Sequence, residues 1–170
     1  MTSQGILTNP YNTHQSILRK AITLTQGPVV EFGCGSGSTP MLHKLCEQRK
    51  LLSLESDPKY HIQFINLASV THRFELVADW PIITARVAQS EWDVAFIDNA
   101  PWEMRVIAVK ALKDKARFVV LHDCDYFTKA GLLNFEKLFK YHKVYLPEKP
   151  WPSRTGPPTL LASNYESCEL

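Results

Sequence analysis

The sequence lacks several signals that would assign it to a class at once. No two of its four cysteines form a C-x-x-C pair, so neither a zinc knuckle nor a dithiol redox motif is indicated. Its apolar runs are far shorter than the roughly 20 residues that a membrane helix needs. The N-terminus is polar and has no signal-peptide core. We therefore expect a cytoplasmic protein with reduced thiols and no membrane partner.

The sequence also lacks a large excess of charge of one sign and any internal repeat. Nineteen basic and 17 acidic residues leave a net charge of +2, which is too balanced to indicate nucleic-acid binding. The C-terminal third is richer in lysine, but no aromatic and basic platform accompanies it, so a solvated helix face is favoured over an RNA-binding edge. The 170 residues contain no repeat and no linker and fit one domain, residues 1–170.

Short apolar segments alternate with amphipathic ones along the chain. The spacing predicts helices over residues 12–24, 38–46, 57–67, 82–88, 103–112 and 129–141. It predicts strands over residues 28–32, 50–55, 74–79, 92–98, 117–123, 143–148 and 158–163. Continuous apolar strands are typical of a parallel sheet that helices cover on both faces. No helix separates the last two strands, so the seventh should return antiparallel to the sixth.

Glycine is infrequent, yet three of the seven glycines fall within "VVEFGCGSGSTP", residues 29–40. Gly33, Gly35 and Gly37 follow a predicted strand, at the place where an open α/β sheet binds its ligand. The dinucleotide fingerprint is G-x-G-x-x-G, whereas here the third glycine comes one position early. An acid inside the strand end, Glu31, suits a cationic ligand better than a pyrophosphate. These features favour S-adenosylmethionine over a nicotinamide cofactor.

This stretch resembles motif I of the class I S-adenosylmethionine-dependent methyltransferases, and the resemblance extends over nearly the whole chain. It implies a Rossmann-like α/β fold with a seven-stranded, mostly parallel sheet, an antiparallel last strand and helices on both faces. It also implies that Glu31 balances the cofactor's ammonium group and that an N-terminal helical segment, residues 1–27, covers the site. The cofactor-binding residues implied by this first motif are Glu31, Gly33, Cys34, Gly35 and Gly37.

Three further stretches are similar to later motifs of that family. In "LLSLESD", Glu55 would accept hydrogen bonds from both ribose hydroxyls, with Ser56 beside it. In "VADW", Asp79 would meet the adenine amino group and Trp80 would pack beside the ring. In "DVAFID", Asp98 would point toward the methionine end of the cofactor or toward the substrate.

Methyl transfer requires alignment and, for many acceptors, removal of a proton. Strand five ends in "LHDCDYF", which makes His122 and Asp123 candidate catalytic residues together with Asp98. One interpretation has His122 or Asp123 acting as a metal-free general base. In another, less favoured, Asp98 and Asp123 with Asp125 hold a divalent cation. In a third, Asp123 only caps the next helix. We assign no metal ligand from the sequence.

The segment "DNAPWE", residues 98–103, indicates a different methyl acceptor, an amine. Asn99 to Trp102 is similar to the N/D-x-P-aromatic motif of enzymes that methylate amines of nucleic acids or proteins, although it starts one residue late. Candidate substrate residues are Tyr11, His14, Asn99 and Trp102, and Tyr126, Trp151 and Arg154 would add to an aromatic acceptor pocket.

We expect methyl transfer to a small molecule, with oxygen preferred. Amine methylation and a non-catalytic, cofactor-binding subunit that needs a partner remain as alternatives, and so does a homo-oligomer that closes the site.

Overall fold

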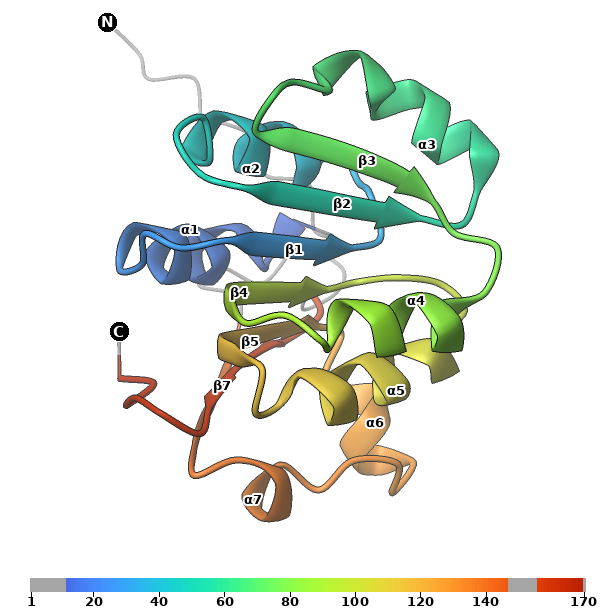
Figure 1. Cartoon of the computed structure of the whole chain (residues 1–170). Helices are drawn as coiled ribbons and strands as arrows, with labels where there is room; N and C mark the ends of the chain where they lie inside the picture. Colours follow the sequence, from blue (N-terminus) through green and yellow to red (C-terminus); the bar gives the residue numbers. More distant parts are fainter. Residues whose placement is uncertain (1–11, 147–155, 170) are drawn as a thin grey trace, which may run out of the picture.

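The structure is a computed structural model that describes residues 12–146 and 156–169. It contains one seven-stranded sheet in the order β3-β2-β1-β4-β5-β7-β6 (Figure 1). The strands are β1 Val29–Phe32, β2 Leu51–Glu55, β3 His72–Leu76, β4 Trp92–Ile97, β5 Ala116–His122, β6 Tyr141–Tyr145 and β7 Thr159–Ser163. β1 to β5 are parallel, and β7 lies between β5 and β6 and is antiparallel to both. The predicted sheet is thereby confirmed.

Helices cover both faces of this sheet, as predicted. The helical segments are α1 Gln15–Thr23, α2 Thr39–Leu45, α3 Pro58–Phe64, η2 Ile65–Leu67, α4 Trp80–Val87, α5 Glu103–Leu112, α6 Asp125–Lys129 and α7 Phe135–Leu138. One buried cluster joins α1 and α2 to one face of the sheet, and a second joins α4 to α7 to the other. The central strands β1, β4 and β5 are buried along most of their length because helices cover both of their faces.

The single helix predicted over residues 129–141 is wrong. α6 ends because Gly131 adopts a φ of +67°, a conformation in which glycine commonly terminates helices. A new turn, α7, then starts at Asn134, whose side chain accepts a hydrogen bond from the Lys137 amide. β6 already begins at Tyr141, two residues before its predicted start.

Arg49 holds the amino-terminal edge of the sheet together. Its guanidinium donates to the carbonyls of Gly27, Ile22 and Thr25 and lies 3.8 Å from Asp93 Oδ2. The opposite, carboxyl-terminal edge carries the candidate site. β1 lies there between β2 and β4, so the chain leaves β1 in one direction and returns on its other side, and ligands of open α/β sheets bind at such a point.

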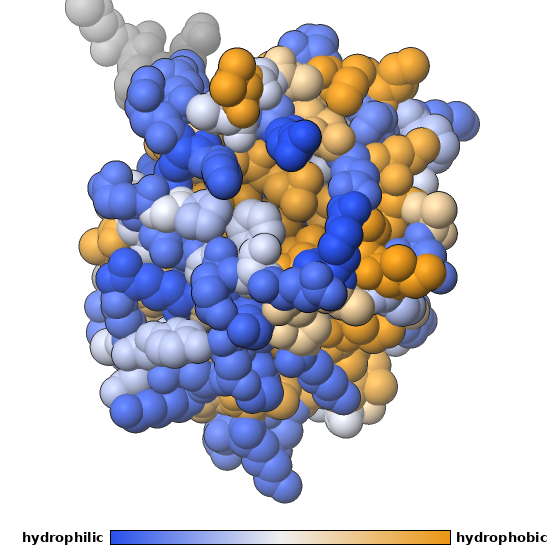
Figure 2. Space-filling view, viewed as in Figure 1, coloured by the Kyte–Doolittle hydropathy of each residue, from blue (hydrophilic) through white to orange (hydrophobic). Residues whose placement is uncertain are grey.

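The surface seen in Figure 2 is mixed, and hydrophobic side chains gather toward its right-hand side, where α3, α4 and α5 lie. Ile82 of α4 is 69% exposed and contributes to the apolar surface of the protein. Among the residues that the structure describes, no helix has the length and apolar character needed to cross a membrane.

Candidate functional site

Glu31 lies beneath the glycine loop. Its carboxylate is fully buried and accepts hydrogen bonds from the hydroxyls of Ser38 at 2.6 Å, Thr39 at 3.0 Å and Ser53 at 2.5 Å. Burial raises the pKa of Glu31 to about 7, although these hydrogen bonds lower it. Glu31 therefore fixes the loop and the start of α2 to β2. Its expected role in balancing the ammonium of the cofactor stays a prediction.

The three glycines differ in what surrounds them. Gly33 has a φ of +91°, and a Cβ there would lie 2.7 Å from the Asp98 carbonyl oxygen, so the loop passes against the end of β4. A Cβ on Gly37 would lie 2.2 Å from Asn12 Oδ1. A Cβ on Gly35 would meet nothing closer than the Ser38 hydroxyl at 3.7 Å. Gly35 is thus the glycine whose missing side chain leaves open space.

The segment that precedes α1 lies on the same loop. Gln15 Nε2 donates to the Gly37 carbonyl at 2.7 Å, next to the contact that Asn12 makes with Gly37. The described part of the N-terminal segment therefore covers one side of the loop. Tyr11, a predicted substrate residue, lies outside the described residues, as do Trp151 and Arg154.

Glu55 ends β2 beside the loop and is 8% exposed. Its Oε2 accepts the Cys34 amide at 2.8 Å and its Oε1 accepts the Asp57 amide at 2.7 Å. Each carboxylate oxygen has a second lone pair, so both can still accept a hydrogen bond from a ligand. Ser56, the next residue, donates to the Ala100 carbonyl at 3.3 Å. The Cys34 thiol is buried, and burial raises the pKa of this thiol.

Asp79 and Trp80 open α4 and face different surroundings. Asp79 is exposed and caps the helix by accepting the Ile82 amide at 2.9 Å. Trp80 is 5% exposed, its ring centroid lies 5.8 Å from that of Phe32, and its indole N–H donates to the Ala100 carbonyl at 2.7 Å. Trp80 is thus a core residue, which differs from the expected packing beside an adenine ring.

A buried arginine joins the ends of β4 and β5. Arg105 of α5 donates to the carbonyls of Asn99, His122 and Asp98 at 2.7, 3.1 and 3.1 Å. Its guanidinium also pairs with Asp98 Oδ1 at 2.9 Å and with Asp123 Oδ2 at 3.4 Å. The guanidinium thus lies between the two carboxylates that the alternative with a divalent cation shared by Asp98, Asp123 and Asp125 would use, and that alternative stays a prediction.

Asp125 turns away from this pair and binds Lys129 at 2.6 Å. The third interpretation of Asp123 is wrong, because α6 has Cys124 at its N-cap and no side-chain cap. Asp123 instead has a φ of +53°, a strained conformation for a residue with a side chain, and its carboxylate is directed toward Arg105.

His122 lies behind Asp98. Its Nδ1 is 3.2 Å from Asp98 Oδ2, and its Nε2 is 3.2 Å from the Thr13 hydroxyl oxygen. The ring is 3% exposed, so the structure directs both nitrogens at protein groups and not at open space. Burial alone would raise the pKa of Asp98, but the hydrogen bond and charge of His122, with Arg105, hold it below its usual range.

His14 is 3% exposed, and its ring centroid lies 4.6 Å from that of His122 and 4.8 Å from that of Phe96. Burial, and then the neighbouring His122, lower the pKa of His14 to about 4. His14 thus joins the catalytic candidates Asp98 and His122 in space, whereas the sequence suggested a place in the acceptor pocket.

Asn99 and Trp102 do not form the amine-binding arrangement that the N/D-x-P-aromatic motif would require. Asn99 is 1% exposed, and the Ala100 carbonyl already accepts hydrogen bonds from Trp80 and Ser56. Trp102 is 41% exposed and lines a cavity that Asp123 also lines.

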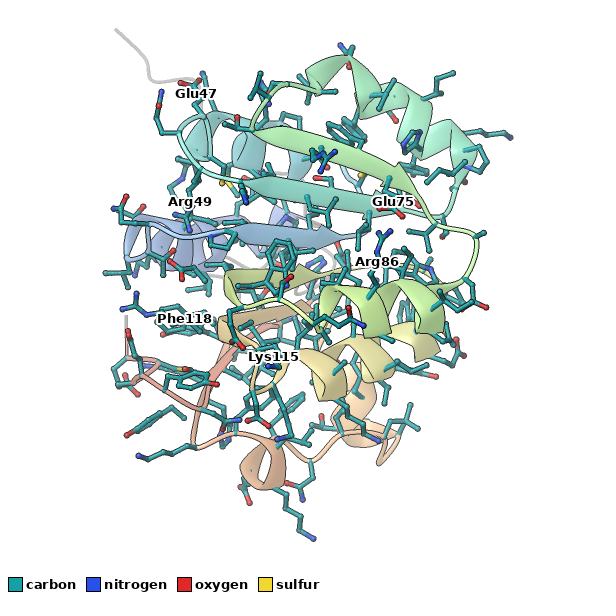
Figure 3. All side chains as sticks on the ribbon, viewed as in Figure 1. Glu47, Arg49, Glu75, Arg86, Lys115 and Phe118 are labelled. Atoms are coloured by element: carbon teal, nitrogen blue, oxygen red, sulfur yellow. The ribbon has the colours of Figure 1, made fainter. Side chains whose placement is uncertain are left out.

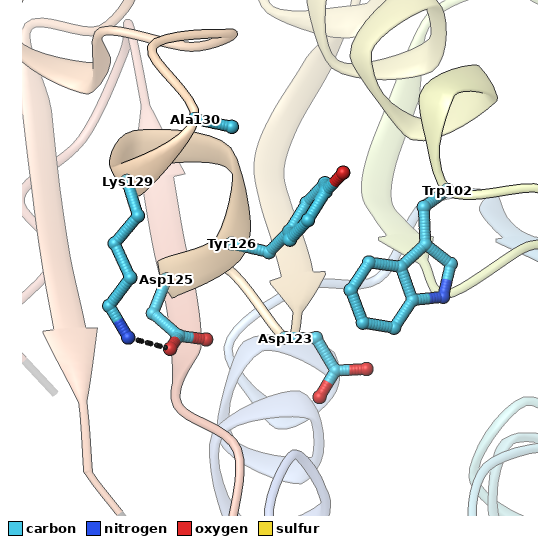
Figure 4. Close-up of a pocket in the computed structure, with 6 residues that line it drawn as sticks. All are labelled: Trp102, Asp123, Asp125, Tyr126, Lys129 and Ala130. Carbon is cyan, nitrogen blue, oxygen red and sulfur yellow. Dashed lines mark hydrogen bonds and ion pairs between the residues drawn. The ribbon is translucent and has the colours of Figure 1, made fainter.

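That cavity has a volume of about 450 Å³. Trp102 and Tyr126 form its aromatic wall, with ring centroids 4.7 Å apart, and Asp123 lies beside them (Figure 4). Its other lining residues are Asp125, Lys129 and Ala130. The cavity therefore combines apolar surface with carboxylate oxygens, next to the Arg105 and Asp98 pair.

Arg105, Thr13 and the hydroxyl ligands of Glu31 were missed by the sequence analysis. One signal could have found Arg105, because it precedes the buried residues Ala108, Val109 and Leu112 at the i+3, i+4 and i+7 positions of one helix face. A cation on that face needs anions nearby, and the strand-end acids are the obvious partners.

No protein-family model matches the sequence, and no curated protein matches it. Among solved structures, spermidine synthase from Thermotoga maritima has a TM-score of 0.67 at 19% identity, covering 94% of this chain and 62% of that chain. Human methyltransferase-like protein 13 in complex with SAH has a TM-score of 0.64 at 16% identity, covering 95% of this chain and 82% of that chain.

The N-methyltransferase NodS from Bradyrhizobium japonicum WM9 has a TM-score of 0.58 at 12% identity, covering 92% of this chain and 97% of that chain. This chain spans less than two thirds of the spermidine synthase. At these identities the likeness establishes the fold alone, a Rossmann-like α/β fold that this chain shares with these methyltransferases and with the spermidine synthase.

Loss of Arg105 should destabilise the protein strongly. Arg105→Met would leave two carboxylates and three carbonyls without their cation, and breaking such a buried pair removes about 3–5 kcal/mol. Urea unfolding measures this free energy. The control is Arg86→Met. Arg86 is exposed and pairs with the half-buried Glu75 (Figure 3), so its loss should lower the free energy of unfolding by about 1 kcal/mol or less. Equal losses in both variants would contradict the assigned role of Arg105.

Glu31 should make stability depend on pH. Its pKa rises from an ordinary value of 4.5 to about 7 on folding, so its favourable contribution is complete below about pH 4.5 and lost as pH rises through about 7. The free energy of unfolding of the wild type, relative to Glu31→Gln, should therefore fall by about 3 kcal/mol between these limits. Urea titrations of both proteins at several pH values test this. A difference that does not change with pH would be evidence against it.

Proposed function

We propose that the protein is an S-adenosylmethionine-dependent methyltransferase that acts on a small acceptor. The observation that carries this proposal is Glu55, a carboxylate held by two backbone amides at the end of β2 beside the open Gly35. A diol such as a ribose can donate to both oxygens of a carboxylate that is held in this way. Gly35 leaves room for the rest of the nucleoside and the methionine part to approach the backbone.

Asp98 supplies the charge that the cofactor requires. Its side chain is 25% exposed at the end of β4, and its lowered pKa keeps it ionised at neutral pH. An ionised carboxylate attracts both the ammonium and the sulfonium of S-adenosylmethionine. We place the methionine end of the cofactor beside Asp98, with His122 as a positioning residue behind it.

The acceptor binds in the cavity between Trp102 and Tyr126. A volume of about 450 Å³ suits a small molecule, and an aromatic wall suits an acceptor with an apolar body. Asp123 and Asp125 can accept hydrogen bonds from hydroxyl groups. Oxygen is favoured over nitrogen as the methylated atom because the Ala100 carbonyl, which an amine would need, is already occupied.

Replacement of Glu55 should weaken the binding of the cofactor. Glu55→Gln removes the charge that receives the ribose hydroxyls, and a hydrogen bond to a charged group contributes about 1.5–3 kcal/mol, which is a loss of affinity of at least about tenfold. Calorimetric titration with S-adenosylmethionine and S-adenosylhomocysteine measures this, with NADH as the negative ligand. Glu75→Gln, on the adjacent strand β3, is the matched control. Equal affinities of all three proteins would refute the cofactor site.

Removal of the aromatic wall should affect the acceptor alone. Trp102→Ala should lower kcat/KM for an accepted substrate by about tenfold, because an aromatic contact contributes about 0.5–1.5 kcal/mol beyond its buried area. Its affinity for S-adenosylhomocysteine should not change.

Transfer of labelled methyl groups to a panel of phenols, aliphatic alcohols and amines identifies the substrate for this test. Tyr60→Ala removes an exposed aromatic residue of α3 and serves as the control. Tight cofactor binding without transfer to any of these compounds would instead support the non-catalytic subunit.

A further inference from the structure

Three potential metal ligands from distant parts of the chain meet at the carboxyl-terminal edge of the sheet. They are His14, just before α1, Asp98, just after β4, and His122, at the end of β5. One atom from each of the three side chains lies within 4.8 Å of the other two. This set is distinct from the carboxylate group Asp98, Asp123 and Asp125, in which Arg105 occupies the space between the first two.

The His14 imidazole is the first sign that a ligand belongs here. The ring is 3% exposed, and neither of its nitrogens has a hydrogen-bond partner among the described residues. A buried polar group without a partner destabilises the folded protein. A lone pair on a buried nitrogen, facing two further ligand atoms, is the arrangement that a metal ion satisfies.

The hydrogen bonds around His122 give an independent reason. The Thr13 hydroxyl has one proton and donates it to the Pro157 carbonyl at 2.5 Å, so Thr13 can only accept from His122 Nε2 at 3.2 Å. His122 Nδ1 lies 3.2 Å from Asp98 Oδ2 but has no hydrogen-bond partner of good geometry among the described residues. A cation between the two atoms, either a proton or a metal ion, would satisfy both of them.

The hydrogen-bond partners of the ligand side chains are also those usually found around a metal centre. Histidine ligands of metals usually donate their other ring N–H to a neighbouring acceptor, and ligating carboxylates are themselves hydrogen-bonded. Here Thr13 receives Nε2–H of His122, and Arg105 binds Asp98 Oδ1 at 2.9 Å, which leaves Oδ2 for an ion. Asp98 is 25% exposed, so an ion can reach the site past this side chain.

We propose that His14, Asp98 and His122 bind one divalent transition-metal ion, zinc by preference, with an open fourth position. Two imidazoles and one carboxylate suit zinc and its neighbours, whereas magnesium and calcium prefer oxygen ligands alone. Bonds of about 2.0–2.1 Å place tetrahedral ligand atoms roughly 3.4 Å apart. His122 and Asp98 nearly meet this spacing already, so a modest movement of the His14 ring completes it.

The open position would take a water molecule or an oxygen of the acceptor. Only this last step rests on the proposed methyl transfer, and it gives a reason for a preference for oxygen, since a zinc ion favours the ionised form of a bound hydroxyl. The metal ion and the methionine end of the cofactor would both use Asp98, so zinc binding is measured in the absence of cofactor.

The test measures zinc binding to the full chain after removal of metal with a chelator. Dialysis against Zn²⁺ followed by elemental analysis should give one ion per chain, and zinc should raise the Tm of the wild type. His14→Phe keeps an aromatic ring in the same buried space and removes the unpartnered nitrogens. Its metal-free form should be at least as stable as the wild type, while its affinity for zinc should be at least about 100-fold lower, which exceeds the 10–100-fold effect typical of losing a hydrogen-bond partner of a ligand.

Two further variants keep the result unambiguous. Asp98→Asn should weaken zinc binding without changing the size of the side chain. His43→Ala removes one member of a second histidine pair, in which His43 Nδ1 lies 3.1 Å from His72 Nδ1, and should bind zinc like the wild type.

The visible spectrum of the Co²⁺-substituted protein should show nitrogen and oxygen ligation without a thiolate band, because the ligand set contains no cysteine. Substoichiometric zinc in the wild type, or full zinc binding by His14→Phe, would overturn the proposal. In either case the titration of S-adenosylhomocysteine would still decide the cofactor site.

Discussion

The carboxyl-terminal edge of the sheet depends on one buried guanidinium. Arg105 reaches from α5 to three backbone carbonyls and two carboxylates, and these groups belong to the ends of two neighbouring strands. A guanidinium can serve five acceptors at once because its donors form a rigid planar fork, which a lysine lacks. The same contact fixes Asp98 and Asp123 at a defined separation. The acceptor cavity on one side and the His14 and His122 pair on the other are therefore both built around this arginine.

A second buried network supports the glycine loop from below. Glu31 binds hydroxyls of the loop, of α2 and of β2, and Ser53 in turn lies 2.9 Å from His72 Nε2. The loop is thus shaped by contacts on its inner side, which leaves its outer side at Gly35 free for a ligand. A loop that is ordered before the ligand arrives loses less conformational entropy on binding, so this preorganisation favours binding.

The sequence predicted the sheet, its antiparallel last strand and nearly all of the helices, because the central strands are mostly apolar and the helices keep one apolar face. The helix over residues 129–141 failed because Gly131 and Asn134 act through local backbone conformation, which an apolar pattern does not report.

Within the site, the motif positions came to one edge of the sheet as expected, since the ends of parallel strands meet there. The partners of each residue could not be predicted. Gly33 approaches the backbone of Asp98, and Trp80 turns into the core, because of contacts between segments far apart in the chain.

The position of β7 has a consequence for how the chain acquires its fold during synthesis. β7 follows β5 and β6 in the sequence, and so leaves the ribosome after them, yet it lies between them in the sheet. Until residue 163 is available, β5 and β6 have no strand between them, and each presents unpaired backbone groups on that side. Until β7 is synthesised, the nascent chain therefore has two strands with unpaired backbone groups, and such strands promote aggregation. Completion of this sheet, and with it the pairing of His122 in β5 with Thr159, therefore requires that residues 159–163 have been synthesised.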